Sequence, residues 1–593
     1  MKKSMFLFGA LFAAGLSFTA CSSDNDMAEN NGPIDNGESY VSFSICLPSA
    51  PSTRGVNDNF DDGLPAEYQV NDATLVLFRG TDAASATALS AYDLSSIWST
   101  SADAQITTTS KVVTPINSSD KPTGSDELFA YVILNKPTTF TIDGSVLKIG
   151  GTAISGTFSS CFGTTNTLTT AALLSTPFVM TNAPLANYPG GASAPTDATY
   201  ISLVQIDKSK IYSTRELAAT SGNEAATINV ERNVAKVTIG TTVEESARKV
   251  KKAGDLSTNI KDANNQDVSW AISGWTLSNV APTTYFQRQV ANIGDWYNLH
   301  SGDVSTNPYR FVGSSAVTSK YRIYWGESYE YTNNSTLLFA SPTEASTASS
   351  TPLYCYENNF PVSKQKENYT TRAIIKLAIN GGKTFYSMNG AYYGNASGGD
   401  APLKAAIANI IKNDPTVSAA LASASLTADD SKATMTLTAS SGIITISDVI
   451  LKNSDESITY NVSTSAASVV SNFNSNHTIK VYTNGISYYS VLIKHFGDEL
   501  TPWNADNHLN TATSYNNSAT VPSSESDYQN DKYLGRYSVL RNNWYDINIT
   551  SVSDLGSPTI PDPGTDWDDN VKSFISVQIN ILSWAKRTQG AAL

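Results

Sequence analysis

A terminal strand that follows a linker constrains the fold of this chain more than any other feature of its sequence. The linker, 557–570, is rich in proline and aspartate, a composition typical of a stiff, solvated segment. From 574 to 582 apolar and polar residues alternate, which predicts a β-strand whose buried face carries Ile575, Val577, Ile579 and Ile581. An isolated strand leaves backbone groups unpaired, so this strand must join a sheet.

A second outlying strand lies near the start of the chain and has the same pattern. Its apolar face carries Val41, Phe43, Ile45 and Leu47, and Pro48 ends it. Either strand could fill one groove in a sandwich that lacks a strand, which is donor-strand exchange. Each would extend roughly 25 to 30 Å, and burying its four side chains contributes at most about 6 to 12 kcal/mol. The alternative is that both strands pair within their own domains.

A loop of small residues follows the first strand. It runs from 51 to 58 around a single arginine, Arg54, and such exposed loops are where proteases cut. We predict cleavage between Arg54 and Gly55. That cut would release everything up to Arg54, including the strand at 41–47, and would leave a groove for a donor strand.

The first residues are an export signal. Lys2 and Lys3 precede the apolar run 5–16, which is too short to span a bilayer and leads through small residues to Cys21. We predict a lipoprotein signal peptide over 1–20, lipid on Cys21, and a propeptide over 21–54 that combines a polar tether with the plug strand. The alternative is ordinary secretion, with Cys21 incidental.

The body of the chain predicts an all-β fold of two β-sandwich domains, 55–229 and 230–556, with a few short helices. Strand-like runs are separated by clusters of glycine, proline, asparagine and aspartate. They lie at 73–78, 128–134, 139–142, 200–206 and 226–230, then at 234–239, 268–277, 321–325, 372–379, 443–451, 478–482, 487–493 and 544–552. Short helices are predicted at 89–97 and 214–219. An amphipathic helix is predicted at 403–412, facing a core rather than a partner.

Composition excludes several classes of function. The 593 residues are 40% hydrophobic and 16% charged, enough to bury a core without disulfide support. The net charge is −14 and the basic residues are dispersed, which argues against a nucleic-acid partner. The four cysteines are too few and too scattered for a disulfide framework or a zinc site, and whether Cys161 pairs with Cys355 stays open.

Motifs for catalysis are absent from the sequence, so we predict no enzyme activity, no cofactor and no metal site. None of the four histidines has metal-ligand spacing, and no nucleophile elbow occurs. The run 381–384 resembles the end of a phosphate loop but lacks its first glycine, which favours a turn between two strands. The acidic run 58–63 could hold calcium but lacks the final glutamate, which favours a solvated turn.

Two other functions remain as alternatives. The 9 tryptophans and 29 tyrosines would suit a surface lipoprotein that binds glycans, although aromatic residues also build sandwich cores. A glycan binder would keep residues 21–54 and would not need a detached terminal strand. A tip adhesin would accept a donor strand without needing to donate one.

Several local sequences resemble one family. They are the leader through Cys21, the cut site at 52–55, the segments 230–236 and 539–547 with Leu555-Gly556, and the terminal 574–584. In this order they resemble the major stalk subunits of Bacteroidales type V fimbriae, the fimbrillin family, in its short-fimbria (Mfa-type) branch. Ser583 and Gly55 depart from the family's common residues, proline and alanine.

The resemblance implies transthyretin-like sandwich domains and a lipoprotein precursor at the outer membrane. It also implies removal of the leader by an arginine-specific protease and head-to-tail assembly of identical subunits in a cell-surface fimbrium. Anchor and tip subunits would be further partners, and adhesion and biofilm formation the outcome. The terminal donor segment argues against an anchor role for this chain.

Overall fold

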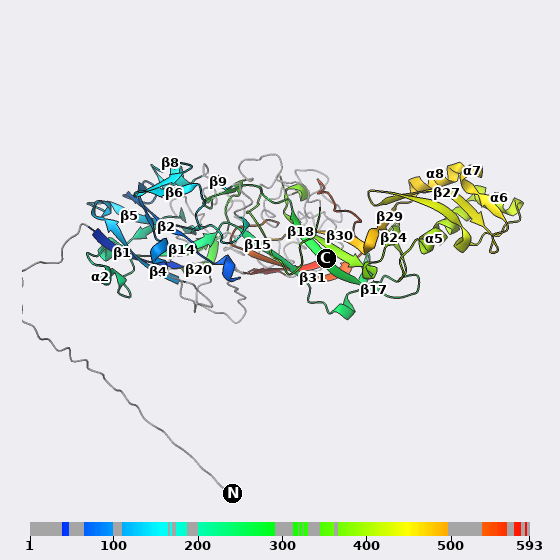
Figure 1. Ribbon diagram of the computed structural model, residues 1–593, viewed down its shortest axis with the longest axis horizontal. Coiled ribbons are helices and arrows are strands. Elements are labelled where there is room, and N and C mark those ends of the chain that lie inside the picture. Colours follow the sequence, from blue (N-terminus) through cyan, green and yellow to red (C-terminus); the bar gives the residue numbers. More distant parts are fainter. Residues whose placement is uncertain are drawn as a thin grey trace, which may run out of the picture.

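A computed structural model describes residues 38–46, 64–98, 109–163, 167–168, 174–186, 200–290, 312–317, 320–323, 325–329, 344–360, 364, 366–495, 537–565, 575–582 and 587–589. The fold is all-β and of sandwich type, as predicted. Figure 1 shows an elongated molecule with the N-terminal sheet at one end and a cluster of helices at the other. Among the described residues, no helix is long and apolar enough to cross a membrane.

The N-terminal sheet has the strand order β3-β2-β5-β10-β14-β1-β4, with β13 also pairing with β5. Strands β2 and β5 are buried on both faces because alternate residues enter two different cores. The strands are β1 Glu38–Cys46, β2 Ala73–Gly80, β3 Thr87–Asp93, β4 Thr109–Asn117, β5 Glu127–Leu134, β10 Met180–Asn182, β13 Val204–Ile206 and β14 Ala226–Arg232.

Smaller elements cover this sheet. The hairpins β6 Phe140–Asp143, β7 Val146–Ile149 and β8 Thr152–Ala153 form one small sheet, and β9 Thr167–Leu168 pairs with β19 Thr284–Tyr285. Another sheet combines β11 Leu185–Ala186, β12 Tyr200–Ile201, β20 Val312–Val317 and β21 Lys320–Ile323. The helices here are α1 Phe158–Phe162 and α2 Arg215–Ala219, and α2 confirms the helix predicted at 214–219.

The helix predicted at 89–97 is wrong. This stretch forms strand β3 followed by the single 3-10 turn Ser95–Ile97. Strand β3 pairs with β2 from Thr87 to Asp93. The buried backbone of β2 needs a hydrogen-bond partner on that side, and this tertiary requirement outweighs the local apolar spacing.

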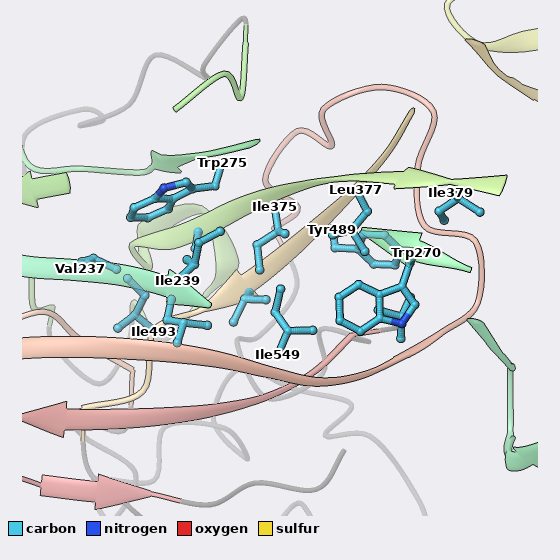
Figure 2. Close-up of a cluster of buried hydrophobic side chains, with 14 of the residues drawn as sticks. Val237, Ile239, Trp270, Trp275, Ile375, Leu377, Ile379, Tyr489, Ile493 and Ile549 are labelled. Atoms are coloured by element: carbon cyan, nitrogen blue, oxygen red, sulfur yellow. The ribbon is translucent and has the colours of Figure 1, made fainter. Parts of the chain in front are cut away.

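The C-terminal sandwich packs two sheets face to face. One sheet has the order β17-β16-β31-β15-β22, with β32 beside β31 and β33 beside β32, and the other is β18-β23-β30. Figure 2 shows Val237, Ile239 and Ile549 of the first sheet against Ile375, Leu377 and Tyr489 of the second. The strands are β15 Ala235–Gly240, β16 Val250–Lys252, β17 Asp255–Asn259, β18 Trp270–Ser278, β22 Leu353–Cys355, β23 Arg372–Ile379, β30 Ile486–Leu492, β31 Trp544–Ser553, β32 Ile575–Leu582 and β33 Arg587–Gln589.

A separate subdomain is inserted between β23 and β30. It has its own hydrophobic core and a sheet of order β25-β24-β29-β27-β26, with β28 beside β27. The elements are β24 Phe385–Met388, β25 Ala391–Tyr393, α5 Ala401–Lys412, α6 Pro415–Ser423, β26 Thr434–Ser440, β27 Ile443–Lys452, β28 Thr459–Asn461, α7 Val462–Ser465, α8 Ala467–Asn476 and β29 Ile479–Tyr482. These helices form the cluster at the far end of Figure 1.

The insertion corrects one prediction and confirms two. Strands 443–451 and 478–482 belong to it and not to the second sandwich. Helix α5 confirms the helix at 403–412, and its buried residues Leu403, Ile407 and Ile411 face the insertion's core. The run 381–384 lies in a turn between β23 and β24, as expected.

Candidate assembly site

Strand β1, the predicted plug, lies inside the N-terminal sheet. It pairs antiparallel with β4 along all 9 residues and parallel with β14 from Phe43 to Cys46. The side chains of Val41, Phe43 and Ile45 are fully buried in the core. Leu47, the fourth predicted plug residue, lies outside the described residues. Strand β1, which comes from the beginning of the chain, is thus hydrogen-bonded to a strand on each side.

Further backbone bonds complete the enclosure of β1. Tyr40 and Tyr212 exchange N–H···O bonds of 2.8 and 3.0 Å, and the Ala225 N–H donates to the Ser42 carbonyl at 2.8 Å. Among the described strands, β4 pairs only with β1. Without β1, the sheet would contain a slot with β4 on one side and β14 on the other, both with unpaired backbone groups.

Cys21, Arg54 and Gly55 lie outside the described residues, as do the signal peptide 1–20 and the acidic run 58–63. After β1, the next described residue is Leu64. The predicted cut therefore falls between the end of β1 and the first turn of the folded body.

The predicted donor strand β32 pairs antiparallel with β31 of its own chain. In this register the apolar residues of the two strands lie opposite one another. The pairs are Ile581 with Tyr545, Ile579 with Ile547, Val577 with Ile549, and Ile575 with Val552. All four β31 partners are fully buried. On its other side, among the described strands, β32 pairs with the 3-residue strand β33. In this chain both outlying strands therefore pair internally.

The two domains meet where the chain passes from β14 into β15, at Asn233 and Val234. This lies a few residues beyond the division expected at 229/230. The segment 539–547 crosses the same point: the Asn542 N–H donates to the Val234 carbonyl at 2.7 Å, and the Lys236 N–H to the Asn543 carbonyl at 2.9 Å. Asn542 has a φ of 59°, a conformation that asparagine tolerates better than most residues.

Buried ion pairs hold this junction together. Arg288 donates to both carboxylate oxygens of Glu231, at 2.8 Å from Nε and 2.7 Å from Nη2. Arg541 pairs with Glu357 and also donates to the Tyr285 carbonyl at 2.7 Å. All four charged side chains are at most 2% exposed. Such pairs are costly to disrupt, because losing one partner leaves the other charge buried and uncompensated.

Glu67 attaches the start of the folded body to this junction. It lies in the 3-10 turn Pro65–Glu67, and its carboxylate accepts from Lys236 Nζ at 2.7 Å and from the Tyr354 hydroxyl at 2.6 Å. Lys236 Nζ also lies 3.8 Å from the centroid of the Trp544 ring. Burial and the bond to Glu67 raise the pKa of Tyr354. The segment after the cleavage loop is therefore bound to β15 and β22 of the C-terminal sandwich.

The residue types alone predict no role for these junction residues, and the segments 230–236 and 539–547 carry only the family resemblance. One signal was available: Glu231, Arg232 and Lys236 lie within an otherwise apolar strand pattern, where charged residues need partners. Their partners are distant in sequence, so spacing could not identify them.

The described residues give little support to the alternative functions. His477 stacks on Phe473, and His495 is buried beside the Tyr545 hydroxyl. No group of three possible metal ligands occurs in the described part of the chain. Cys161 and Cys355 are both buried and are not linked by a disulfide. Of the tryptophans that the structure describes, none is exposed, so none offers an open platform for a sugar ring.

Comparison with known proteins points to one family through the C-terminal part of the chain. No curated protein sequence matches. Two crystal structures align weakly. One is a proposed cell adhesion protein from Bacteroides eggerthii, with 11% identity, a TM-score of 0.26, and coverage of 95% of this chain and 100% of that one. The other is a fimbrial assembly protein from Parabacteroides distasonis, with 9% identity, a TM-score of 0.25, and coverage of 57% and 81%.

At these TM-scores neither structure bears on function. The family evidence is a match over residues 509–590, which include β31, the linker and β32. The matching family is described as "Major fimbrial subunit protein type IV, Fimbrillin, C-terminal". Residues 509–590 of this chain are therefore similar to the C-terminal region of the fimbrillins.

Proposed function

We propose that this chain is the structural subunit of a fimbrial stalk, of the short-fimbria branch, and that it polymerises by protease-triggered donor-strand exchange. The observation that carries the proposal is the fimbrillin match over 509–590, which includes the strand offered as donor. The position of β1 supports it, because the strand that precedes the expected cut fills a slot between two other strands.

Donor-strand exchange requires β32 to leave β31. The strand pairings at the two sites indicate why it would. Among the described strands, β32 pairs with β31 along its length on one side and with the short β33 on the other. In the slot of β1, a strand meets β4 along its whole length and β14 along part of it. Each added ladder bond contributes about 0.5 to 1.5 kcal/mol. The slot of β1 pairs its strand with 9 residues of β4 and 4 of β14, against 8 of β31 and 3 of β33 for β32, so a neighbouring subunit's slot would offer the donor slightly more ladder bonds.

Cleavage between Arg54 and Gly55 by an arginine-specific protease is the proposed trigger. Before the cut, Cys21 carries lipid and holds the precursor on the outer membrane, and β1 blocks the slot. After it, the mature chain starts at Gly55 and stays bound to the domain junction through Glu67. Identical subunits then join head to tail in a cell-surface fimbrium, with anchor and tip subunits at its ends and adhesion and biofilm formation as its role.

Polymerisation of the purified chain tests the proposal. We would treat the full-length protein with an arginine-specific protease and look for fibres by electron microscopy and for boiling-resistant ladders on gels. Two controls isolate the steps: Arg54→Ala removes the cut, and a chain that ends at Asp569 keeps the cut but lacks the donor. We expect fibres only from the full-length chain that can be cut.

Correct cleavage without ladders or fibres would contradict the stalk role. Fibres from the chain ending at Asp569 would show that another segment donates. The glycan-binding alternative gains no support from the described aromatic residues. A tip adhesin would accept a donor peptide corresponding to 570–593 after cleavage but would form no chains longer than the resulting pair.

A further inference from the structure

The linker after β31 is docked along the C-terminal sandwich, although its composition predicts a solvated segment. Ser557 exchanges backbone bonds of 2.9 and 2.8 Å with Tyr488 in β30. The Tyr482 hydroxyl donates to the Gly556 carbonyl at 3.0 Å, and the Tyr489 hydroxyl to the Asp554 carbonyl at 2.9 Å. Most residues from 557 to 565 are half-buried.

Arg372 holds the middle of this linker. It is the first residue of β23 and is fully buried. Its Nη2 donates to the Pro561 carbonyl at 2.6 Å, and its Nη1 to the Ser490 hydroxyl at 3.2 Å. A buried guanidinium that donates to the backbone of a proline-rich segment fixes that segment's position, since charge-assisted bonds are the stronger ones.

Glu367 holds the end of the docked stretch. One carboxylate oxygen pairs with Arg372 Nη1 at 3.0 Å, and the other accepts from the Gly564 N–H at 2.8 Å. Its side chain is only 12% exposed. One carboxylate therefore joins the arginine and the linker backbone in a single network.

The inserted subdomain contributes a contact on another side. Gly442, in the turn between β26 and β27, lies against Pro558, because a Cβ at that glycine would come within 2.7 Å of Pro558 Cγ. Arg372 and Glu367 of the sandwich thus bind the linker, and the insertion contacts Pro558, the first proline of the linker.

We propose that Arg372 and Glu367 form a linker clamp, which fixes the point at which the C-terminal strand leaves its subunit. With the clamp closed, the backbone is fixed as far as Gly564, and a stretch as long as 566–574 spans at most about 30 Å. The clamp therefore limits where the neighbouring subunit can sit, and a fixed exit point makes each joint in a fibre alike. The inference about fibre geometry rests on the proposed stalk function, whereas the clamp itself does not.

Hydrogen exchange of the uncleaved chain tests the clamp without any polymerisation. The variant Glu367→Gln keeps the size of the side chain, but its amide cannot accept from both Arg372 and Gly564. The control is Glu456→Gln, the same change at a surface pair with Lys452, in which Glu456 is 47% exposed. We expect the Gly564 amide to exchange about tenfold faster or more in Glu367→Gln and at the wild-type rate in the control.

Exchange in β5, far from the linker, reports on general loss of stability and should not change. Equal exchange of the Gly564 amide in wild type and Glu367→Gln would overturn the clamp. Because burial of Arg372 makes its removal a risk to folding, a second variant, Arg372→Lys, keeps the charge but cannot reach both Pro561 and Glu367. We expect it to release residues 561–564 in the same way.

Fibres from the same variants test the effect on assembly. After cleavage, Glu367→Gln should give fibres with a clearly shorter persistence length in electron micrographs than wild type or Glu456→Gln. Unchanged stiffness in a variant whose linker exchanges faster would overturn the geometric role. A wild-type chain that is cut and makes no fibres would instead refute the stalk function, and the exchange result would still decide the clamp.

Discussion

At the scale of single residues, charge buried between the domains distinguishes this chain from a simple pair of sandwiches. Glu231, Arg288, Glu357 and Arg541 are almost inaccessible to water and pair across segments far apart in the sequence. Buried pairs of this kind add little stability relative to apolar residues but specify one arrangement of their surroundings. Their role here is to join β14 to the segment after β19, and the segment after β22 to the one before β31, in one orientation.

Removing one charge of a buried pair should therefore be severe. We expect Glu231→Gln to lower the free energy of unfolding by about 3 to 5 kcal/mol, because Arg288 would remain buried without its counter-charge. Chemical denaturation followed by tryptophan fluorescence measures this. Asp143→Asn is the matched control, since it breaks a pair with Lys148 whose aspartate is 70% exposed, and it should change stability little. Equal effects of the two changes would contradict the importance of burial.

Cys161 and Cys355 should be unreactive in the native protein. Burial raises the pKa of Cys355 to about 12 and also raises the pKa of Cys161. At pH 8 both thiols stay protonated, and the thiolate is the reactive species. Peptide mapping after iodoacetamide treatment should find both unmodified in the folded chain and both modified in denaturant.

The same burial has a consequence for stability at high pH. An unfolded thiol loses its proton near its ordinary pKa of 9.0, whereas Cys355 keeps its proton when folded. The folded state then binds more protons, so stability should fall as pH rises above about 9. Rapid labelling of Cys355 in the native protein at pH 8 would refute this account of its environment.

At the scale of elements, β1 is both a core strand and the strand that the proposed function removes. Its apolar face fills the N-terminal core, so it contributes to stability before cleavage. Its connection to the rest of the body runs only through the segment that contains Arg54. A single cut there makes β1 a non-covalently bound peptide, and the strength of its packing then sets how quickly it leaves.

Weakening that packing should speed its release. We expect Phe43→Ala to destabilise the uncleaved chain by about 3 to 5 kcal/mol, because Phe43 is fully buried. After cleavage, the leader should dissociate at least tenfold faster than from wild type, as measured by size-exclusion chromatography and mass spectrometry. Ser44→Ala, on the other face of the same strand, is the control and should behave like wild type. A cut leader that never dissociates from either variant would contradict the plug role of β1.

At the scale of the whole molecule, the inserted subdomain is nearly independent of the sandwich that carries it. It has a separate core, and both of its connections run through neighbouring strands, β24 and β29. Phe385 of β24 stacks on Tyr482 of β29 with ring centroids 4.3 Å apart, and both belong to the sandwich core. The insertion therefore begins beyond this pair of aromatic rings.

The insertion should be removable without unfolding the rest. Deleting residues 391–478 leaves Asn389 and Gly390 to connect Met388 with its paired residue Ile479. Both loop residues already have positive φ, 52° and 83°, which a two-residue hairpin of type I′ requires. Because Met388 and Ile479 would lose their core partners, both should be changed to threonine. We expect a cooperative thermal transition with a midpoint close to that of the full chain.

The matched control for this deletion is the same chain with Ala-Ala in place of Asn389-Gly390. Alanine disfavours positive φ, so the control should melt several degrees lower or aggregate. If the Asn-Gly version also fails to fold, the insertion is an integral part of the sandwich.

The sequence by itself determined the β-class of the fold, most strands and the two outlying strands, because these depend on local alternation and on turn residues. It also determined α2, which Thr214 caps, and α5, whose apolar stripe is local. The match at 509–590 agrees with the resemblance seen in 539–547 and 574–584.

Only the tertiary structure decided the rest. Strand β3 takes the place of the expected helix because β2 needs a partner. Strand 443–451 separates into an insertion because its apolar face meets helices, and 478–482 pairs with it although Tyr482 reaches the sandwich core. The buried ion pairs join Glu231 with Arg288, 57 positions apart, and Glu357 with Arg541, 184 positions apart. The linker clamp joins Arg372 with Pro561, 189 positions apart, and Glu367 with Gly564, 197 positions apart. Partners at such separations leave no periodic signal, so only folding brings them together.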